Sequence, residues 1–255
     1  MTHPTIASFE FHLVAYRRLW RASVLSSFLL PVLFLVSMGV GVGGYIDART
    51  SGLGASYVDY IAPGVLATTA LQVAVSESAW PVYDKFEWTR QFHAMVASPL
   101  RIIDILRGQM LYILTRVSVS CAGFLVVMAL FGTLHSARFM AALPVAGLIG
   151  LATSAPSLAF AATVTNDGMF AVLFRFAVVP MSLFGGVFFP VDSLPLVPRL
   201  LAYVSPLWHG VELCRAATLG TPTTWGVPVH LAVLAAWGAA GYLLARRAFT
   251  KKLAD

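Results

Sequence analysis

Charged residues are scarce in this sequence. Asp, Glu, Lys and Arg make up only 11% of the 255 residues, whereas hydrophobic residues make up 58%. Soluble domains carry roughly 25% charged residues, so this composition excludes a soluble globular domain. The mean hydropathy of +0.80 indicates an integral membrane protein. The net charge of +6 then needs no nucleic-acid partner, because basic residues gather on the cytoplasmic side of membrane proteins.

Cysteines and catalytic motifs are scarce as well. Cys121 lies in an apolar run and Cys214 in a proline-rich passage, which argues against a disulfide framework or a metal site. The six histidines show no metal-ligand spacing, and the patterns G-x-x-x-x-G-K-[ST], H-E-x-x-H and G-x-S-x-G are missing. We therefore expect no catalytic residue, no metal and no cofactor in this chain. The N-terminal segment is polar and amphipathic, so we also expect no removable signal peptide.

Long apolar runs are abundant. A membrane-spanning helix needs about 20 mostly apolar residues. Six segments meet this requirement, namely 22–43, 60–80, 109–131, 139–163, 168–189 and 226–245. The sequence therefore predicts an all-α membrane protein with six transmembrane helices in a single domain over residues 1–255.

Basic residues orient these predicted spans. Three precede the first span, four lie between the second and third, and four follow the sixth, which places eleven of the seventeen on one side. The positive-inside rule makes that side cytoplasmic. We expect a protein of the cytoplasmic (inner) membrane with both termini inside, and the passage 190–215 outside.

The first twenty residues have a helical pattern of their own. Ile6, Phe9, Leu13, Tyr16 and Trp20 recur at spacings of three and four, on one helical face. Such a helix, over 1–20, would lie in the cytoplasmic interface of the membrane. The alternative is that it begins the first span early.

The segment 83–109 is the only sizeable loop predicted on the inner side, and it mixes aromatic with charged residues. Ser98 before Pro99 matches an N-cap and first helical position, so we expect a new helix to start there. Two interpretations are open for residues 83–98. They form either a docking element for a partner or a solvated linker whose aromatic rings lie at the lipid headgroups.

Four polar residues fall at or near membrane depth. Glu77 ends the second span, Arg116 lies in the third and Arg175 in the fifth, with Gln72 five residues before Glu77. Ionisable residues at this depth are costly and are functional candidates. They are candidates for a transport pathway. The alternative is structural: the arginines reach the interface, or one of them pairs with Glu77.

Three blocks resemble a known family. They are "YVDYIAPGVLATTAL" (57–71), "MVASPLRIIDILRGQML" (95–111) and "GGVFFPVDSLPLVPRLLAYVSPLWHGVELCRAATLG" (185–220). Together they resemble the type-two permeases of ABC exporters, especially the branch with lipo-oligosaccharide (nodulation-factor type) and daunorubicin-type drug export permeases. The loop between the first two spans is short, which leaves no room for an extracellular substrate-receiving domain.

The resemblance implies a role for two segments. In such permeases the inner loop is a coupling helix seated in an ATPase, and short re-entrant helices precede the last span. The implied coupling residues are Asp84, Phe86, Trp88, Arg90, Phe92 and Met95. The implied re-entrant element contains Gly186, Phe189, Pro190, Leu194, Pro195, Pro206, Trp208, Glu212 and Arg215.

The resemblance also implies partners. Two permease chains, identical or related, would pair among membrane lipids, each with a P-loop ATPase on a separate chain that binds ATP and Mg. The complex would export an amphipathic substrate, namely a lipid-linked saccharide, a lipid or a hydrophobic drug.

Other function classes are weaker. An ion-gradient-driven transporter would more plausibly show two related halves, and none is evident. An intramembrane lipid-modifying enzyme could use His209 and Glu212 as an acid–base pair, but the sequence offers neither a nucleophile nor a metal beside them. A non-transporting membrane scaffold is a third alternative. ATP-dependent export would separate the exporter from all three.

Overall fold

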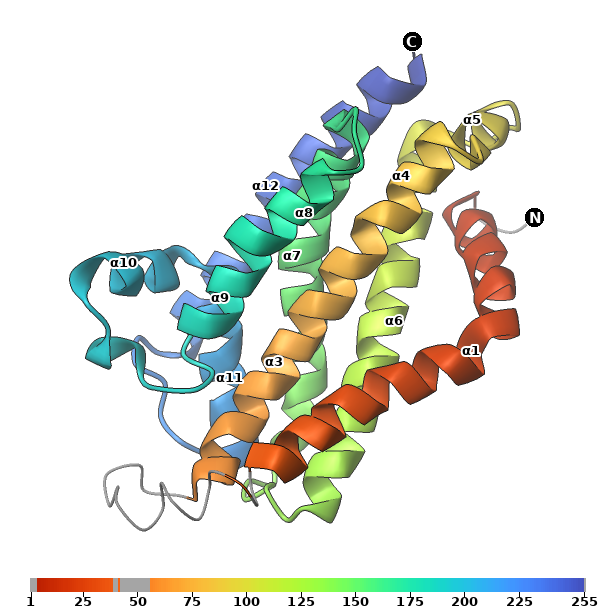
Figure 1. Ribbon diagram of the computed structural model, residues 1–255. Coiled ribbons are helices and arrows are strands. Elements are labelled where there is room, and N and C mark those ends of the chain that lie inside the picture. The colour runs from red at the N-terminus through yellow and green to blue at the C-terminus, as the bar shows by residue number, and fades with distance from the viewer. Residues whose placement is uncertain (1–3, 39–40, 42–55, 255) are drawn as a thin grey trace.

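The computed structural model describes residues 4–38, 41 and 56–254, without the side chains of residues 15 and 17–31. Helices dominate this part of the chain and it contains no strand, which confirms the predicted all-α class (Figure 1). The side chains of Arg17, Arg18, Trp20 and Arg21 lie outside the described residues, as does most of 39–43 at the end of the first predicted span.

Among the residues that the structure describes, four helical segments are long and apolar enough to cross a membrane. They are Tyr57–Glu87, Ile102–Leu130, Phe139–Thr163 and Val227–Ala254. The first comprises α3 (Tyr57–Ser78) and α4 (Trp80–Glu87), the second is α6, the third is η2 (Phe139–Ala141) with α7 (Ala142–Thr163), and the fourth is α12. The predicted spans 60–80 and 139–163 fall within these segments, and the predicted spans 109–131 and 226–245 each extend one residue beyond theirs.

The N-terminal segment is one uninterrupted helix, α1 (Pro4–Val36), which changes direction between its two halves (Figure 1). Its first half turns polar residues toward the protein. Thr5, Ser8 and His12 are buried, whereas Ile6 and Phe11 are exposed. The Thr5 hydroxyl donates to Asp104 Oδ1 of α6 at 2.9 Å. The exposed apolar face suits a helix that lies against lipid.

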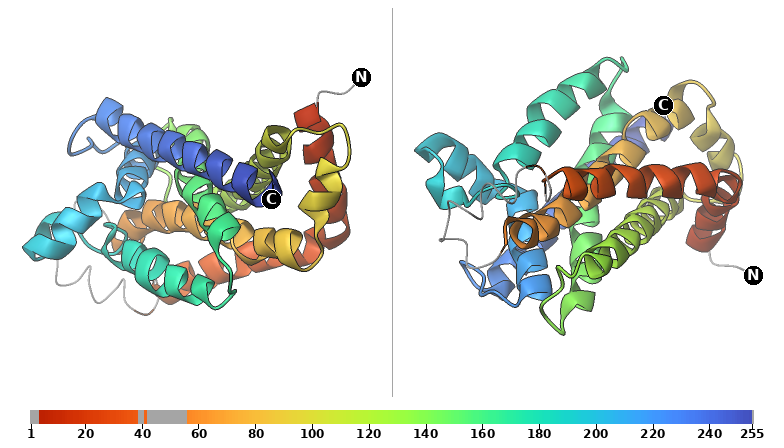
Figure 2. Two further views of the ribbon diagram at one scale, coloured as in Figure 1. Left: turned by 90° about the horizontal axis from the view of Figure 1, so that it is seen from above. Right: turned by 60° about the horizontal axis from the view of Figure 1, so that its bottom comes forward.

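The middle of the bundle is built on α7, which packs against α3, α6, α11 and α12. In Figure 2, α12 and the slanted part of α1 run along opposite sides of this core. A Cβ added at Gly241 of α12 would lie 2.4 Å from Pro156 Cδ of α7. Only glycine fits this crossing, as is common where helices approach closely in membranes.

The fifth apolar stretch and the segment after it are divided into short helices. Residues 169–184 form α8 (Met169–Leu173), the π-helical turn η3 (Phe174–Val178) and α9 (Val179–Phe184). Then follow η4 (Val191–Ser193), α10 (Leu196–Val204) and α11 (Pro206–Leu219). In Figure 1, α10 stands out from the side of the bundle.

The fifth apolar helix ends at Phe184, five residues before the predicted end at 189. The physical reason is Gly186, whose φ of +77° is readily adopted only by glycine. The prolines then start new helices. Pro190 and Pro195 are the N-cap residues of η4 and α10, and Pro206 is the first residue of α11. Proline suits these places because the first N–H groups of a helix have no partner within it.

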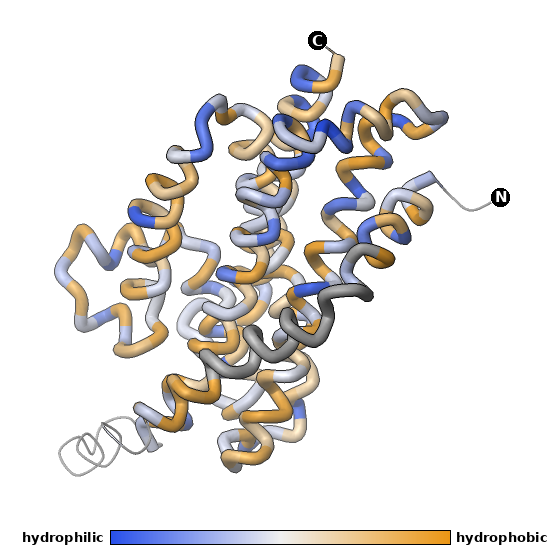
Figure 3. Tube along the Cα trace, turned by 45° about the vertical axis from the view of Figure 1, so that its right-hand side comes forward, coloured by the Kyte–Doolittle hydropathy of each residue, from blue (hydrophilic) through white to orange (hydrophobic). Residues whose placement is uncertain are grey.

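The two ends of the bundle differ in what they carry. Both termini, α4 and α5 (Gln91–Val96) lie at one end, and the start of α3 and the end of α11 lie at the other (Figure 1). Figure 3 shows hydrophilic stretches at the end with the termini and long hydrophobic stretches along the helices. We call the end with the termini, α4 and α5 the terminal end. We call the end with the start of α3 and the end of α11 the opposite end.

Candidate functional site

The terminal end carries a tip formed by residues 88–94. The chain breaks at Ala79 after α3, continues as α4, and turns through Arg90 into α5. Arg90 has a φ of +49°, a left-handed conformation that costs a non-glycine residue roughly 1–2 kcal/mol. The surrounding fold therefore holds this turn against an intrinsic preference.

Three aromatic rings hold the tip to the bundle. The ring centroids of Phe86 and Phe92 are 4.8 Å apart, and those of Phe86 and Phe249 of α12 are 4.9 Å apart. Phe86 is 1% exposed and Phe92 0%. These two predicted coupling residues therefore brace the tip, and neither presents a surface to a second protein.

Other predicted coupling residues are accessible. Trp88 is 62% exposed and Arg90 is also exposed, whereas Asp84 and Met95 are half-buried. The Asp84 backbone carbonyl accepts a hydrogen bond from the Thr89 hydroxyl at 3.1 Å. Trp88 and Arg90 are thus the predicted residues that a partner can reach.

The predicted helix start at Ser98 is wrong. Ser98 lies in a turn, and its hydroxyl donates to the Met95 carbonyl at 2.6 Å, closing the end of α5. Helix α6 begins three residues after Pro99, with Arg101 as its N-cap residue.

Two of the predicted membrane-depth residues form an ion pair. Arg116 Nη2 lies 2.9 Å from Glu77 Oε1, and Arg116 Nε donates to the same oxygen at 3.0 Å. The Tyr16 ring centroid lies 4.5 Å from the guanidinium carbon. The pair joins α3 to α6 and neutralises two charges that would be costly alone. This arrangement matches the structural alternative.

The other two candidates are not brought to this pair. Arg175 is exposed on η3, and Gln72 is exposed on α3. A further polar group near the pair had no clear signal in the sequence. Lys85 Nζ donates to Gln109 Oε1 at 2.8 Å and lies 3.4 Å from His12 Nδ1. Lys85 thereby connects α4 to α6 and α1, although the sequence alone places it in the predicted inner loop.

Gln72 borders an apolar groove of about 420 Å³. Its walls come from α1, α3 and the run 169–188. Thr68, Gln72 and Ser76 recur every four residues along α3 and line one side, while Phe34, Phe174 and other apolar side chains line the rest. A narrow polar stripe in an apolar groove fits an amphipathic molecule.

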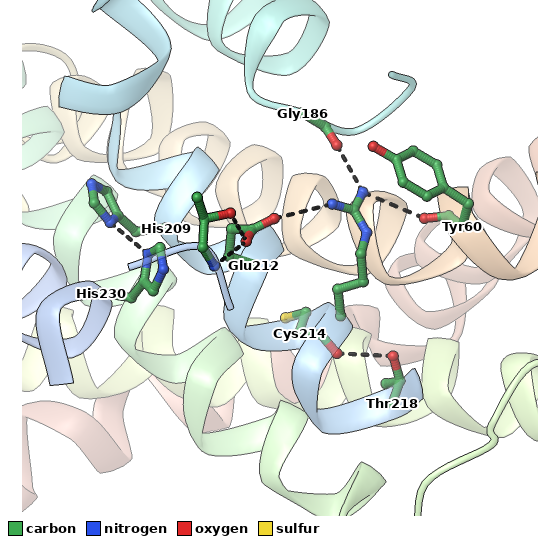
Figure 4. A network of polar contacts seen from close by, with 9 residues as sticks. Tyr60, Gly186, His209, Glu212, Cys214, Thr218 and His230 are labelled. Carbon is green, nitrogen blue, oxygen red and sulfur yellow. Dashed lines mark hydrogen bonds and ion pairs between the residues drawn. The ribbon is translucent and has the colours of Figure 1, made fainter. Parts of the chain in front are cut away.

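At the opposite end, Arg215 of α11 connects three elements (Figure 4). Its Nη2 donates to the Gly186 carbonyl at 2.8 Å, and its Nη1 lies 3.3 Å from Glu212 Oε1. Its guanidinium carbon lies 4.0 Å from the ring centroid of Tyr60 on α3. Glu212 Oε2 accepts from both the backbone N–H and the hydroxyl of Thr224, at 3.1 and 2.9 Å.

Several predicted residues of the re-entrant element meet around this arginine. Gly186, Pro190, Trp208 and Glu212 line one cavity with it. Leu194 is buried in a small cluster with Trp208, against which Phe189 packs. Pro195 and Pro206 act at helix starts, as described above.

The sequence of residues 6–219 matches the family described as "ABC-2 type transporter". This match covers most of the chain. The chain belongs to the ABC-2 type transporter family. The resemblance found in the sequence is thereby confirmed, and the chain is a membrane transport subunit.

Several relatives of this ABC-2 transporter chain are nodulation proteins. It is 31% identical to Nodulation protein J of Rhizobium leguminosarum bv. trifolii, over 85% of this chain and 82% of that protein. It is 29% identical to Nodulation protein J of Rhizobium leguminosarum bv. viciae, over 94% and 91% of the two chains. With Nodulation protein J of Rhizobium meliloti the identity is 26%, over 97% and 93%.

One polar pair of this ABC-2 transporter chain was missed by sequence reasoning. His209 Nδ1 of α11 lies 2.8 Å from His230 Nδ1 of α12, and His209 Nε2 lies 2.9 Å from the Tyr203 carbonyl (Figure 4). Because a carbonyl only accepts, His209 carries its proton on Nε2 when neutral, and His230 then donates through Nδ1. His209 is thus engaged by these two groups and Glu212 by Arg215 and Thr224, so the described contacts do not support the acid–base pair of the enzyme alternative.

Proposed function

We propose that this chain is the transmembrane permease subunit of an ABC exporter. It moves an amphipathic substrate, namely a lipid-linked saccharide, a lipid or a hydrophobic drug, outward across the cytoplasmic membrane. The ATP and Mg are bound and the ATP hydrolysed by a separate P-loop ATPase, so this chain itself needs no cofactor. Membership of the ABC-2 family and the nodulation protein relatives support this proposal.

The proposed complex holds two permease chains, identical or related, and two ATPase subunits. Each permease crosses the membrane six times, with α1 and the run 169–184 added to the four long segments, and both termini on the cytoplasmic side. The terminal end then faces the ATPase, and α10 and α11 form the re-entrant element on the outer side.

The observation that carries the coupling role is the braced tip. Trp88 and Arg90 are exposed at the end of a turn that three packed phenylalanines hold in place. A rigid support with an exposed aromatic and an exposed arginine suits a contact that transmits force, since Trp and Arg are enriched at energetically important interface positions.

Co-purification tests this proposal. The permease is isolated from its host in mild detergent, and bound proteins are identified by mass spectrometry. We expect a P-loop ATPase with the unaltered chain and its loss with Trp88→Ala combined with Arg90→Gly. Glycine relieves the left-handed turn at residue 90, so the variant should remain as stable as the parent, within about 1 kcal/mol.

One variant serves as a control for this test, and another is unsuitable. Arg138→Ala removes an exposed arginine at the opposite end and should leave the ATPase bound. Phe92→Ala is a poor probe, because it would empty a buried site and destabilise the fold by about 3 kcal/mol. A permease that purifies alone, with transport indifferent to ATP, would contradict the exporter function and favour ion-gradient-driven transport.

For the pathway, we propose the groove beside Gln72. The Glu77–Arg116 pair is not among the residues that line this groove, and it braces α3 against α6, because each charge already has its partner. Gln72→Trp would fill the groove from its exposed edge. We expect ATP-dependent export in proteoliposomes to fall at least about tenfold, which is an effect of about 1.4 kcal/mol on the transport barrier, with ATPase binding retained. Export at the parent rate would exclude the groove as the pathway.

A further inference from the structure

A second hollow lies at the opposite end, away from the braced tip. It is a cavity of about 580 Å³ between the start of α3, the segment 186–192, α10, α11 and the loop that follows α11. This volume suits a small ligand or the headgroup of an amphiphile. Its lining differs from that of the groove, because it is rich in carboxylates and aromatic rings.

The cavity has an excess of negative charge. Asp59, Asp192 and Glu212 line it, against a single guanidinium, that of Arg215. His135 also lines it, with Nε2 3.1 Å from Asp59 Oδ1. Among the described lining residues, three carboxylates therefore face one guanidinium, in a chain whose net charge is +6. The Arg199 guanidinium lies outside this lining and is held by backbone carbonyls, with Nη2 2.7 Å from that of Asp192 and 2.8 Å from that of Leu194. An anionic headgroup would be repelled here.

The carboxylate of Asp192 can accept further hydrogen bonds, whereas that of Glu212 is already engaged. Glu212 is engaged by Arg215 and Thr224. Asp192 is exposed, and among the described residues its carboxylate receives one hydrogen bond, from the Tyr203 hydroxyl to Oδ1 at 2.6 Å. Because an ionised carboxylate offers about four lone-pair sites, Asp192 can face a positively charged ligand.

Aromatic rings form the other part of the wall. Tyr203 and Trp208 line the cavity with ring centroids 4.7 Å apart. Aromatic faces attract cations, and rings combined with carboxylates recognise alkylammonium groups. The protein already uses one ring in this way, since the Arg215 guanidinium lies over Tyr60 at the edge of the same cavity.

Consecutive residues line the cavity and the apolar groove. Gly186 lines the cavity, whereas Val187 and Phe188, the next two residues, line the groove. A molecule with its head in the cavity thus has an apolar surface nearby for its chain.

We propose that this cavity binds the cationic ammonium headgroup of an amphiphile, with Asp192 as its principal counter-charge and Tyr203 and Trp208 as its aromatic walls. The binding itself is independent of ATP. Only the further step, that such an amphiphile is the exported cargo, rests on the proposed exporter function.

Three amphiphiles with the same twelve-carbon chain test the assignment. Dodecyltrimethylammonium carries a cation, dodecyl maltoside a neutral saccharide, and dodecanoate an anion. Their binding to the permease in zwitterionic lipid nanodiscs is measured by calorimetry, and binding to empty nanodiscs is subtracted. We expect the ammonium to bind at least about tenfold more tightly than the other two.

The residue assignment is tested by Asp192→Asn. Asparagine keeps an acceptor for the Tyr203 hydroxyl and removes the charge, so ammonium binding should weaken by about tenfold. Asp167→Asn removes an exposed carboxylate in the loop between α7 and α8, remote from the cavity lining, and should change nothing. Glu212→Gln is the second cavity variant and should weaken ammonium binding in the same direction.

The outcomes separate the site from the function. Equal binding of the three headgroups, preference for the saccharide or the anion, or an Asp192→Asn variant with parental affinity would overturn the site. Tight, Asp192-dependent ammonium binding supports it even if no ATPase co-purifies. If the ammonium binds but the complex with the ATPase does not transport it, the binding site is supported and the proposal that this amphiphile is the exported cargo is contradicted.

Discussion

The two ends of the bundle are held by different kinds of contact. At the terminal end, Phe86, Phe92 and Phe249 pack ring against ring. At the opposite end, one arginine joins α3, α11 and the segment after α9 through a carbonyl, a carboxylate and an aromatic face. Apolar packing is non-directional, whereas hydrogen bonds and ion pairs demand geometry.

This difference suits what each end is proposed to do. A tip that receives force from a partner benefits from close packing, because packed interiors are hardly compressible and transmit strain. A cavity that admits a ligand must combine polar groups that can exchange one partner for another. If the comparison is correct, damage at one end should leave the other unaffected, since distant sites without shared partners contribute additively.

The largest expected effect is that of Arg215→Met. Arg215 and Glu212 side chains are 11% and 14% exposed, and breaking a buried pair leaves an uncompensated charge. We expect a loss of about 3–5 kcal/mol in stability, measured by denaturant unfolding in nanodiscs. ATPase binding at the other end should persist in the folded fraction.

The double variant Arg215→Met with Glu212→Gln is the control for this prediction. It removes the stranded charge and keeps an acceptor for Thr224, so it should be more stable than Arg215→Met alone. Equal instability of the two variants would show that the packing of the arginine, and not its charge, holds this end together.

Sequence reasoning found the features that depend on local chemistry. The scarcity of charge predicts the membrane class. The prolines at 190, 195 and 206 mark breaks in the chain, and the structure places each of them at a helix start. The end of the fifth helix at Phe184 was misplaced because an apolar run alone does not reveal where a glycine takes a positive φ.

Contacts between residues far apart in the sequence could not be predicted from the sequence alone. Phe92 reads as an exposed aromatic of a charged loop, and only the packing of α12 brings Phe249 over it. The His209–His230 contact likewise needs α11 and α12 to be placed side by side. The Glu77–Arg116 pair was one of two alternatives, because opposite charges at membrane depth favour pairing whatever the fold.

The smaller expected effect is that of Phe92→Leu at the terminal end. Leucine keeps the site apolar but removes two ring contacts, each worth about 0.5–1.5 kcal/mol, so we expect a stability loss of about 1–3 kcal/mol. Although Phe92 itself is buried, the tip should loosen and ATPase retention should fall, measured by co-purification and by faster amide hydrogen exchange over 80–96. Ammonium binding at the cavity should keep its parental affinity.

Phe249→Leu removes the same packing from α12 and should reproduce both results. Faster exchange at α10 or weaker ammonium binding in either variant would mean that the two ends are coupled through the bundle, and the independence inferred from their contacts would be wrong.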